Sequence, residues 1–352
     1  MAWIGPIVGG LIKNVNLGVE YPHGFSPLPL IASFEINEEC DQRCPYCYLA
    51  RRKSSSFGKS NEALFPLMKK CVDLGIQFIT VSGREPLLDR DSLRYLQSLD
   101  SLRHRRGSLL RYGFNTNGLG IDRHLGILRK LAPDWVTLSI DGYEQGHDAQ
   151  RGQGTFGIVT SNLIRLHSLP QYSGRVEVAS TMSSTSVEGD IFELTKYLRD
   201  IGVRMHSITP VIEMTSDGRH HQPSSSQLLD YYVQHAEEVK DVEVYFILMK
   251  NADNEGILAR YSLTPGYKNL MDQDCYRIAE TSNIYILSHN ATRYFRITSD
   301  GHLLRGASLF ETDYVAASLG RPSAQSLPAM LREVFRRDMT LDFYKQHLKW
   351  LN

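Results

Sequence analysis

The chain has 352 residues, of which 42% are hydrophobic and 10% aromatic, and its 39 basic and 39 acidic side chains cancel to a formal net charge of zero. That length can bury a full core, and the charge balance gives no sign of a nucleic-acid or membrane-surface binder. No stretch reaches the roughly 18 apolar residues of a membrane span, and residues 1–13 lack the basic start and cleavage site of a signal peptide. We therefore expect a cytoplasmic protein with no nucleic-acid partner and no membrane partner.

Strand-like runs alternate with helix-length stretches after an N-terminal extension of residues 1–27. The expected strands are 30–37, 76–81, 109–115, 135–140, 175–182 and 204–211. A helix is expected over 190–201, where apolar residues recur on one face and Gly202 ends the pattern. Such alternation predicts an α/β fold with a parallel sheet and crossover helices, and six repeats make an open, partial (β/α)6 barrel.

The pattern weakens beyond residue 215, where we place a domain boundary. A polar loop is expected over 217–226 and a strand over 242–248. A hairpin is expected from strands 294–298 and 302–304 around a Ser-Asp-Gly turn, and a helix from Pro328 onward. The sequence thus predicts a core of residues 28–215 and a C-terminal α+β extension of residues 216–352.

Three of the five cysteines, Cys40, Cys44 and Cys47, lie within eight residues directly after the first expected strand. Iron–sulfur clusters normally take four cysteine ligands, so a three-thiolate loop leaves one iron open to chelation by a small molecule. Structural zinc is the alternative, but no histidine lies near the loop and the spacing is unusual for a zinc ribbon. Clustered cysteines are a poor disulfide framework and indicate a metal site in a reducing compartment.

Polar turns follow the first four expected strands. The cysteine loop follows the first, and the others are followed by Ser82-Gly83-Arg84-Glu85-Pro86, Asn115-Thr116-Asn117-Gly118 and Ser139-Ile140-Asp141-Gly142. Ligands of such sheets bind at the carboxyl ends of the strands, so we expect the four turns to converge on one rim. Asp141 itself is more often structural at a strand end than catalytic.

The Cys-x3-Cys-x2-Cys loop, with an aromatic residue before its last cysteine and a later Gly-x-Glu-Pro turn, resembles the radical S-adenosylmethionine (SAM) superfamily over residues 28–215. Residues 295–303 and 139–152 are similar to the GTP 3′,8-cyclase branch of molybdenum-cofactor biosynthesis. The resemblance implies a TIM-like partial barrel of the radical SAM type.

The resemblance implies a role for each matching residue. Cys40, Cys44 and Cys47 would ligate a [4Fe–4S] cluster whose fourth iron is chelated by SAM. Glu85 would face the ammonium of the SAM methionine, and Tyr46 would lie beside the cluster and the adenine. The other implied cofactor-binding residues are Ser82, Gly83, Thr116, Asn117, Ser139 and Arg151. Reduction by a low-potential donor such as flavodoxin or ferredoxin would cleave SAM to a 5′-deoxyadenosyl radical that abstracts a substrate hydrogen.

This chain departs from the pattern in two places. Arg84 replaces the usual second glycine of the turn, which either tolerates a side chain or recruits it to an anion. The cyclase branch also carries three tail cysteines for a second cluster, whereas only Cys275 lies in this tail. A single cluster is therefore expected, and the GTP cyclase assignment is not. The expected catalytic and substrate-holding residues are Cys275, Arg296 and Arg305, with Cys275 either a packing residue or a thiol that quenches a substrate radical.

The favoured function is an oxidoreductase, isomerase or lyase that acts on a small-molecule biosynthetic substrate, such as a nucleotide, sugar or amino-acid derivative. The alternative within this chemistry is modification of a ribosomally made peptide, although such relatives usually add a leader-binding domain and a cysteine-rich tail. A non-catalytic metal-binding module is disfavoured because Glu85, Thr116 and Ser139 accompany the cysteines. The sequence does not name the substrate.

Overall fold

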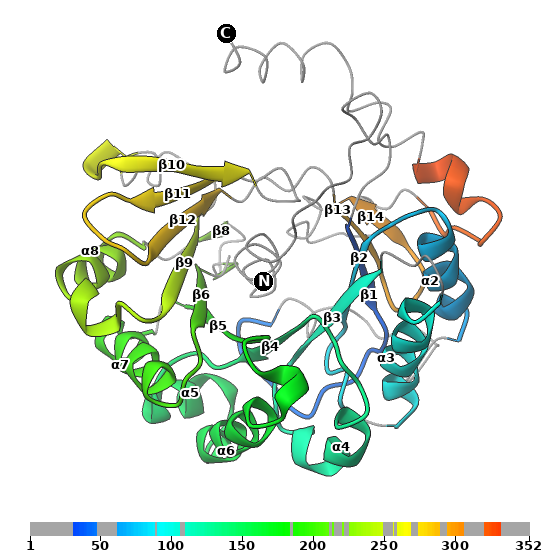
Figure 1. Ribbon diagram of the computed structural model, residues 1–352, viewed down its shortest axis with the longest axis horizontal. Coiled ribbons are helices and arrows are strands. Elements are labelled where there is room, and N and C mark those ends of the chain that lie inside the picture. The colour runs from blue at the N-terminus through cyan, green and yellow to red at the C-terminus, as the bar shows by residue number, and fades with distance from the viewer. Residues whose placement is uncertain are drawn as a thin grey trace, which may run out of the picture.

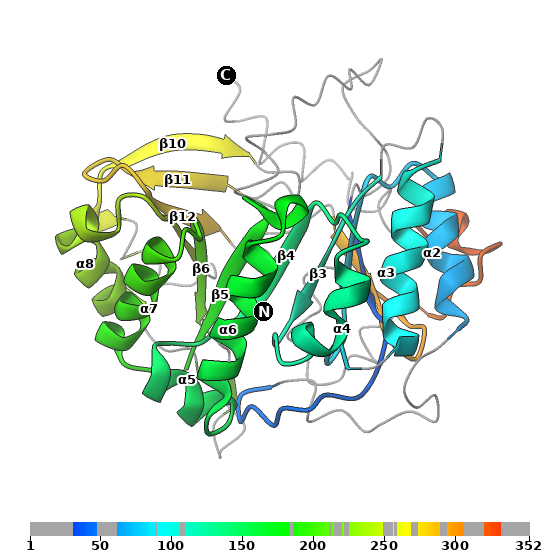
Figure 2. The same cartoon turned by 60° about the horizontal axis from the view of Figure 1, so that its bottom comes forward.

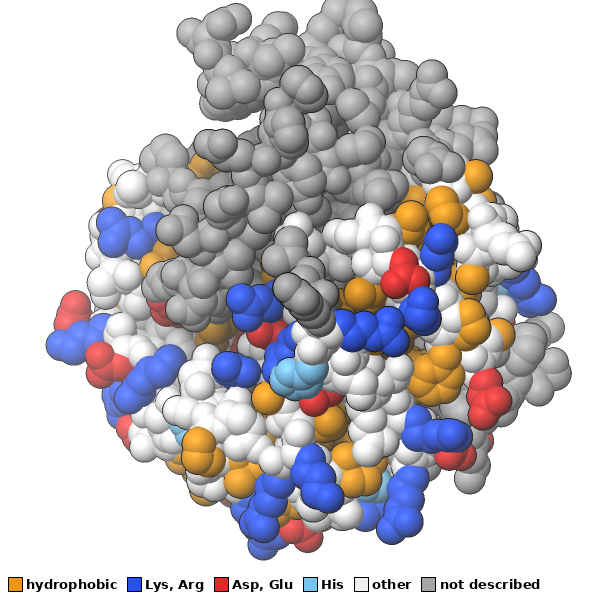
Figure 3. All heavy atoms as spheres, turned by 45° about the vertical axis from the view of Figure 1, so that its right-hand side comes forward, with side chains coloured by type: hydrophobic (Ala, Val, Ile, Leu, Met, Phe, Trp, Pro, Cys, Tyr) orange, Lys and Arg blue, Asp and Glu red, His pale blue; other side chains and the backbone are white. Residues whose placement is uncertain are grey.

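The computed structural model describes most of the chain between residues 31 and 331. The described residues are 31–47, 62–88, 90–105, 110–183, 186–210, 213–214, 220–221, 225–248, 256, 259–268, 274–288, 294–305 and 320–331. Within this part, no helix is both long enough and apolar enough to cross a membrane. Basic and acidic side chains both occur across the described surface of the face in Figure 3.

Six parallel strands in chain order form the centre of the sheet. They are β1 (Ile31–Glu35), β2 (Phe78–Ser82), β3 (Arg111–Thr116), β4 (Trp135–Ser139), β5 (Val176–Met182) and β6 (Met205–Pro210). Each lies within about two residues of its expected position, which confirms the predicted parallel α/β sheet. The helices between and after them are α2 (Leu64–Asp73), α3 (Arg90–Arg103), α4 (Ile121–Leu128), α5 (Glu144–Arg151), α6 (Thr155–His167), α7 (Glu188–Asp200) and α8 (Ser226–Gln234), with 3-10 turns η2 (Pro170–Tyr172) and η3 (Ala236–Val239).

The C-terminal residues extend this sheet at both edges. Their strands are β9 (Glu243–Leu248), β10 (Leu263–Lys268), β11 (Asp274–Ile278), β12 (Ile284–Ser288), β13 (Tyr294–Ile297) and β14 (Leu303–Arg305). The described residues form one 12-stranded sheet in the order β10-β11-β12-β9-β6-β5-β4-β3-β2-β1-β13-β14. Its two edge strands are not paired with each other, so the barrel is open as predicted (Figure 1).

The sheet does not break at the boundary expected near residue 215. On one side β9 pairs in parallel with β6, and on the other β13 pairs in parallel with β1. The expected hairpin forms as β13 and β14, with Gly301 at a positive φ of 84° in the turn. The division into a core and an extension therefore stays a prediction, because the strand order shows no boundary between them.

Two parts of the predicted tail are only partly described. The expected loop of residues 217–226 contains β8 (His220–His221), which pairs with β7 (Glu213–Met214). The expected C-terminal helix is seen as helical residues 327–331, and its continuation lies outside the described residues.

The helices cover the outer, convex face of the sheet (Figures 1 and 2). Because successive strand residues point to opposite faces, every second side chain packs against these helices. Helix α7 shows the matching stripe, since Ile191, Leu194 and Leu198 are all buried. It ends before Gly202, whose φ of +84° suits the left-handed helix stop.

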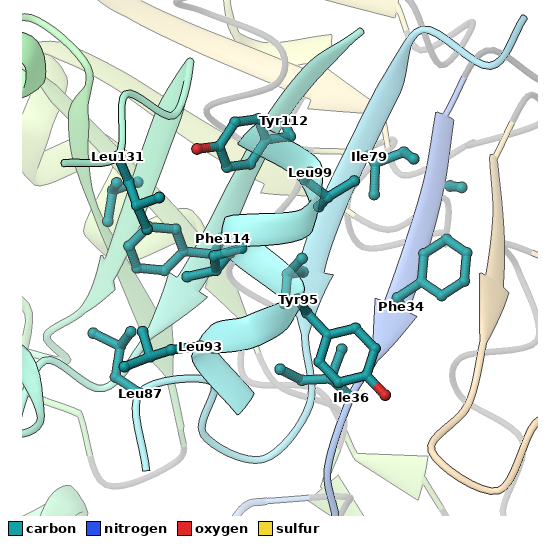
Figure 4. Close-up of a cluster of buried hydrophobic side chains, with 14 of the residues drawn as sticks. Phe34, Ile36, Ile79, Leu87, Leu93, Tyr95, Leu99, Tyr112, Phe114 and Leu131 are labelled. Carbon is teal, nitrogen blue, oxygen red and sulfur yellow. The ribbon is translucent and has the colours of Figure 1, made fainter. Parts of the chain in front are cut away.

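The main hydrophobic core lies between helices α2–α7 and the outer face of β1–β5, and β13 and β14 also contribute to it. Figure 4 shows Phe34 of β1, Ile79 of β2 and Phe114 of β3 in one cluster with Leu93 and Leu99 of α3. A second cluster, with Ile208, Phe246 and Ile286 among its members, lies under α7 and α8. These cores fix the outer face, so the intervening residues of the same strands face the inside of the barrel.

Candidate active site

The carboxyl ends of β1–β4 and the loops that follow them form a polar rim, as the sequence predicts. The loop after β1 meets the end of β3 through Asn117, whose Nδ2 donates to Asp41 Oδ1 over 2.6 Å. The same amide nitrogen lies 3.7 Å from the Cys40 sulfur. The loop after β2 joins them, because the backbone N–H of Asn117 donates to Glu85 Oε2 over 2.7 Å. Three of the four predicted turns are thereby held together.

The three cysteines of the loop after β1 are half-buried free thiols. The Cys47 N–H donates to the Cys44 carbonyl over 3.0 Å, and the Cys40 sulfur accepts from the Gln42 N–H over 3.4 Å. Burial raises the pKa of Cys40 to about 12 and also raises the pKa of Cys44. The Cys40 and Cys44 thiols are therefore neutral unless a metal displaces their protons.

The donor set fits an iron–sulfur cluster better than a single ion. In the described part of the chain, no three His, Cys, Asp or Glu side chains are placed to hold one metal ion. A four-iron cluster instead binds each thiolate through a different iron, so its sulfur ligands need not converge on a point. Three thiols in one short, half-buried loop fit that requirement and would hold three irons, so the fourth would be open to a small-molecule ligand.

Glu85 is a fully buried carboxyl group at the centre of the rim. Its Oε1 accepts hydrogen bonds from Thr116 Oγ1 over 2.7 Å and from the Leu87 N–H over 2.8 Å. Burial nevertheless raises the pKa of Glu85 to about 7, although these bonds and that from Asn117 act to lower it. A cationic ligand beside this carboxyl group would favour its charged form, so the site suits an ammonium group.

The turn after β2 is shaped around Asn37. Gly83 has a φ of +138°, and a Cβ there would lie 2.9 Å from Asn37 Oδ1, so the position requires glycine. That oxygen accepts from the N–H of Arg84 over 3.2 Å, which shows that the turn forms with a side chain at this position. The Ser82 hydroxyl lies 3.0 Å from the Ser33 hydroxyl of β1 and so bonds within the sheet. Recruitment of Arg84 to an anion stays a prediction.

Asp141, at the end of β4, joins the cysteine loop to α5 and β5. Arg151 donates to both carboxylate oxygens, from Nε over 2.6 Å and from Nη2 over 3.0 Å. The Tyr46 hydroxyl donates to the same carboxylate, and so does the Thr181 N–H over 2.8 Å. The third Arg151 nitrogen, Nη1, lies 3.4 Å from Gln42 Oε1. Two residues predicted to contact SAM, Tyr46 and Arg151, are therefore oriented by one buried acid.

Sequence reasoning missed this role of Asp141 and the role of Asn37. The available signal was Arg151 itself, because a guanidinium predicted to lie at a buried rim needs a carboxylate to balance it. The predicted residue Ser139 is half-exposed on the inner face at the end of β4. Its contact with SAM stays a prediction.

Two of the three predicted catalytic residues, Cys275 and Arg296, lie on strands near opposite edges of the sheet, and the catalytic role of all three stays a prediction. Cys275 is buried on β11 and pairs with Leu287 of β12. Arg296 lies on β13, near the opposite edge of the sheet, where it is buried and ion-paired with Glu35 of β1 over 2.6 Å. It faces the barrel interior because β13 pairs with β1, rather than lying on an exposed hairpin. Arg305 ends β14, and its side chain lies outside the described residues.

Comparison with known families identifies the class of protein. The model of the Radical SAM superfamily matches residues 34–221, which is just over half of the 352 residues. The chain belongs to the radical SAM superfamily. Members of this superfamily are enzymes that use a [4Fe–4S] cluster and SAM, so the predicted enzyme class and cofactors are confirmed.

Individual relatives are distant. A GTP 3′,8-cyclase of Corynebacterium glutamicum (strain R) is 30% identical over 110 residues, which cover 30% of this chain and 29% of the cyclase. The matched segment thus spans less than a third of that relative. Native anSMEcpe with bound AdoMet superimposes with a TM-score of 0.57 at 18% identity, over 90% of this chain and 83% of that chain. Streptococcus suis SuiB bound to precursor peptide SuiA gives a TM-score of 0.55 at 16% identity, over 80% and 60%. Both structures show the shared fold.

Proposed function

We propose that this enzyme cleaves SAM reductively at a single [4Fe–4S] cluster and that the resulting 5′-deoxyadenosyl radical abstracts a hydrogen atom from a small-molecule biosynthetic substrate. The observation that carries the proposal is the rim, where a three-thiol loop lies against a buried carboxyl group and a buried Asp–Arg pair. When bound, the cluster supplies the electron and an open iron for the amino acid end of SAM.

Each rim residue has a distinct task in this proposal. Cys40, Cys44 and Cys47 hold the cluster. Glu85 accepts the SAM ammonium, and its hydrogen bonds from Thr116 and Asn117 fix the carboxyl group before SAM arrives. Such preorganisation lowers the cost of orienting the ligand.

On the other side of the cysteine loop, Asp141 supplies the negative charge that pairs with Arg151. The Asp141 carboxylate neutralises Arg151, so the guanidinium is held without an unpaired charge. The nitrogen that points to Gln42 remains the part of Arg151 best placed to meet the SAM carboxylate. The Arg151 guanidinium also lies 5.9 Å from the centre of the Tyr46 ring, which keeps that ring beside the cysteines.

Two classes of substrate are compatible with this chemistry. The sequence likeness to a cyclase named for GTP supports a small molecule. The fold likeness to SuiB, solved with a precursor peptide, keeps a ribosomally made peptide as the second candidate. Supplying a nucleotide pool and a peptide pool to the reduced enzyme would separate the two, because only the true substrate class accelerates SAM cleavage.

The test of the reaction itself is the fate of SAM. Anaerobically reconstituted enzyme, reduced chemically or by flavodoxin or ferredoxin, is expected to release 5′-deoxyadenosine slowly without substrate. S-adenosylhomocysteine as the main product would show a methyl transfer instead and would overturn the proposed reaction.

A further inference from the structure

The inner face of β2–β6 is lined by polar side chains. Thr137 lies between Val136 and Leu138, and Glu177 lies between Val176 and Val178, all four of which belong to the core on the helix side. Because side chains alternate along a strand, Thr137 and Glu177 point into the barrel. The same argument places one polar residue from each of the five strands there, and we call this set the inner strip: Thr80, Asn115, Thr137, Glu177 and Thr209.

Every member of the inner strip has a buried polar atom without a hydrogen-bond partner in the described structure. These atoms are Thr80 Oγ1, Asn115 Oδ1 and Nδ2, Thr137 Oγ1, Glu177 Oε2 and Thr209 Oγ1. In closed (β/α)8 barrels, branched apolar side chains usually fill the positions that face the interior. Native proteins leave few buried polar atoms unpaired, so one on each of five neighbouring strands calls for a polar ligand.

Strand register brings the central members together. Asn115 pairs with Thr137 between β3 and β4, and Thr137 pairs with Glu177 between β4 and β5. Ser207 of β6 donates to Glu177 Oε1 over 2.9 Å, which fixes the carboxyl group by one oxygen. Glu177 Oε2 has no partner among the described residues, and the residue beside Glu177 in the register is Thr137, with Asn115 one strand further along the inner face.

Glu177 differs from the other buried glutamate of this face. Glu35 on β1 is ion-paired with Arg296 over 2.6 Å, whereas only the Ser207 hydroxyl bonds to Glu177 among the described residues. Burial raises the pKa of Glu177 well above its usual range, and the hydrogen bond from Ser207 opposes this rise. A group that brings N–H donors, with or without positive charge, is the chemistry that satisfies such a carboxyl group.

Two residues of the inner face are partly exposed. Asn115 and Ser139 are half-exposed although both belong to the inner face of the sheet, and Ser139 is two residues beyond Thr137 on β4. The inner face thus runs from Ser139 at the rim to the buried Thr137 on the same strand and to Glu177 on the next.

We infer that Glu177, with Thr137 on the next strand and Asn115 on the strand beyond it, is the recognition site for a nitrogen-bearing donor group of the substrate, such as an amidine, ammonium or amide. This inference rests on the proposed function, because it assigns the inner face to the molecule that meets the radical. It places a specificity determinant in the barrel and not only in residues 216–352.

The test uses formamidinium, a small planar cation with two N–H-bearing nitrogens, and acetate as its anionic counterpart of similar size. Calorimetry or ligand-observed NMR on the reconstituted full chain with SAM is expected to show formamidinium binding and no acetate binding. The Glu177→Gln and Glu177→Leu variants are expected to weaken formamidinium binding roughly ten- to a hundredfold, the range for a hydrogen bond to a charged group. Glu243→Gln is the matched control, since Glu243 lies on β9 and already accepts from the Tyr245 hydroxyl.

Two outcomes overturn the inference: no formamidinium binding to the wild type, or equal binding to the wild type and the Glu177 variants. Should the Glu177 variants not fold, Thr137→Val keeps the side-chain shape and removes only the hydroxyl, and it is expected to weaken binding severalfold. Release of 5′-deoxyadenosine by the wild type tests the proposed function separately. If 5′-deoxyadenosine is not released but formamidinium still binds in a Glu177-dependent way, the proposed reaction is wrong and the inferred binding site at Glu177 is supported.

Discussion

The rim and the inner strip share strands β2, β3 and β4, but their polar atoms differ in how many hydrogen bonds the protein gives them. At the rim, Glu85 accepts three hydrogen bonds and Asp141 accepts four, all from the protein itself. On the inner strip, Glu177 has one partner and Thr137 and Asn115 have side-chain atoms with none among the described residues. Hydrogen bonds that are already formed within the protein suit the binding of a cofactor that is the same in every turnover. Polar atoms without a protein partner suit the binding of a group that the substrate supplies.

The largest expected effect is loss of the cluster, which we expect for variants of the rim cysteines and not for a variant of the buried cysteine of α2. Replacing Cys40, Cys44 or Cys47 with Ala is expected to abolish the visible absorbance of the cluster, and the wild type is expected to bind about four irons per chain. Cys71→Ala is the control, because Cys71 packs in the core. An iron content near twice that value would show a second cluster and contradict the single site.

The second-largest expected effect is a loss of unfolding free energy when the hydrogen bonds and ion pair of Asp141 are removed. Asp141→Asn leaves the Arg151 guanidinium buried without its counterion, which typically costs about 3–5 kcal/mol of unfolding free energy. The same change at Asp73, whose exposed carboxylate pairs with Lys69 over 2.7 Å, is expected to cost at most about 0.5 kcal/mol. Urea unfolding of the two variants measures this difference. Equal losses of unfolding free energy would show that the contacts of Asp141 do not stabilise the fold more than a surface ion pair does.

Removing the Glu85 charge tests whether the rim serves SAM. Glu85→Gln keeps the side-chain shape and is expected to weaken SAM binding roughly ten- to a hundredfold, the range for a charge-assisted hydrogen bond. Iron content should stay at the wild-type level because the cluster needs only the thiols. Loss of iron together with SAM affinity would mean that Glu85 supports the loop and not the ligand.

The pH dependence of stability tests whether Glu177 is unpaired in the ligand-free protein. Burial raises the pKa of the folded-state carboxyl group above the ordinary value of 4.5, so the neutral form stabilises the fold and that stability is lost as pH rises through the folded-state pKa. Relative to Glu177→Gln, the wild type is expected to lose up to about 1.4 kcal/mol of unfolding free energy per pH unit. A difference that is flat above pH 5 would show that Glu177 has a cationic partner.

Local patterns were sufficient to predict the strands and the rim. The alternation of β1–β6 with helices and the stripe on α7 are set by nearby residues, and the cysteine loop and the turn at Glu85 are short motifs. Both are therefore visible in the sequence alone.

Contacts between distant residues were not predictable in the same way. Asp141 and Tyr46 are 95 residues apart, and Arg296 and Glu35 are 261 apart, so neither pair leaves a local signal. The Arg296 environment in particular depends on β13 pairing with β1, which no periodicity in the tail indicates. The inner strip likewise exists only through the register of β3, β4 and β5, because Glu177 by itself is one polar residue in a strand.

The most direct test of the division between rim and inner strip is a crystal structure of the reconstituted enzyme with SAM, grown without oxygen and without substrate. We expect the SAM ammonium within hydrogen-bond distance of a Glu85 oxygen and no SAM atom in contact with Glu177 or Thr137. SAM bound against Glu177, or an ammonium group held away from Glu85, would contradict the assignment of the rim to the cofactor and of the inner face to the substrate.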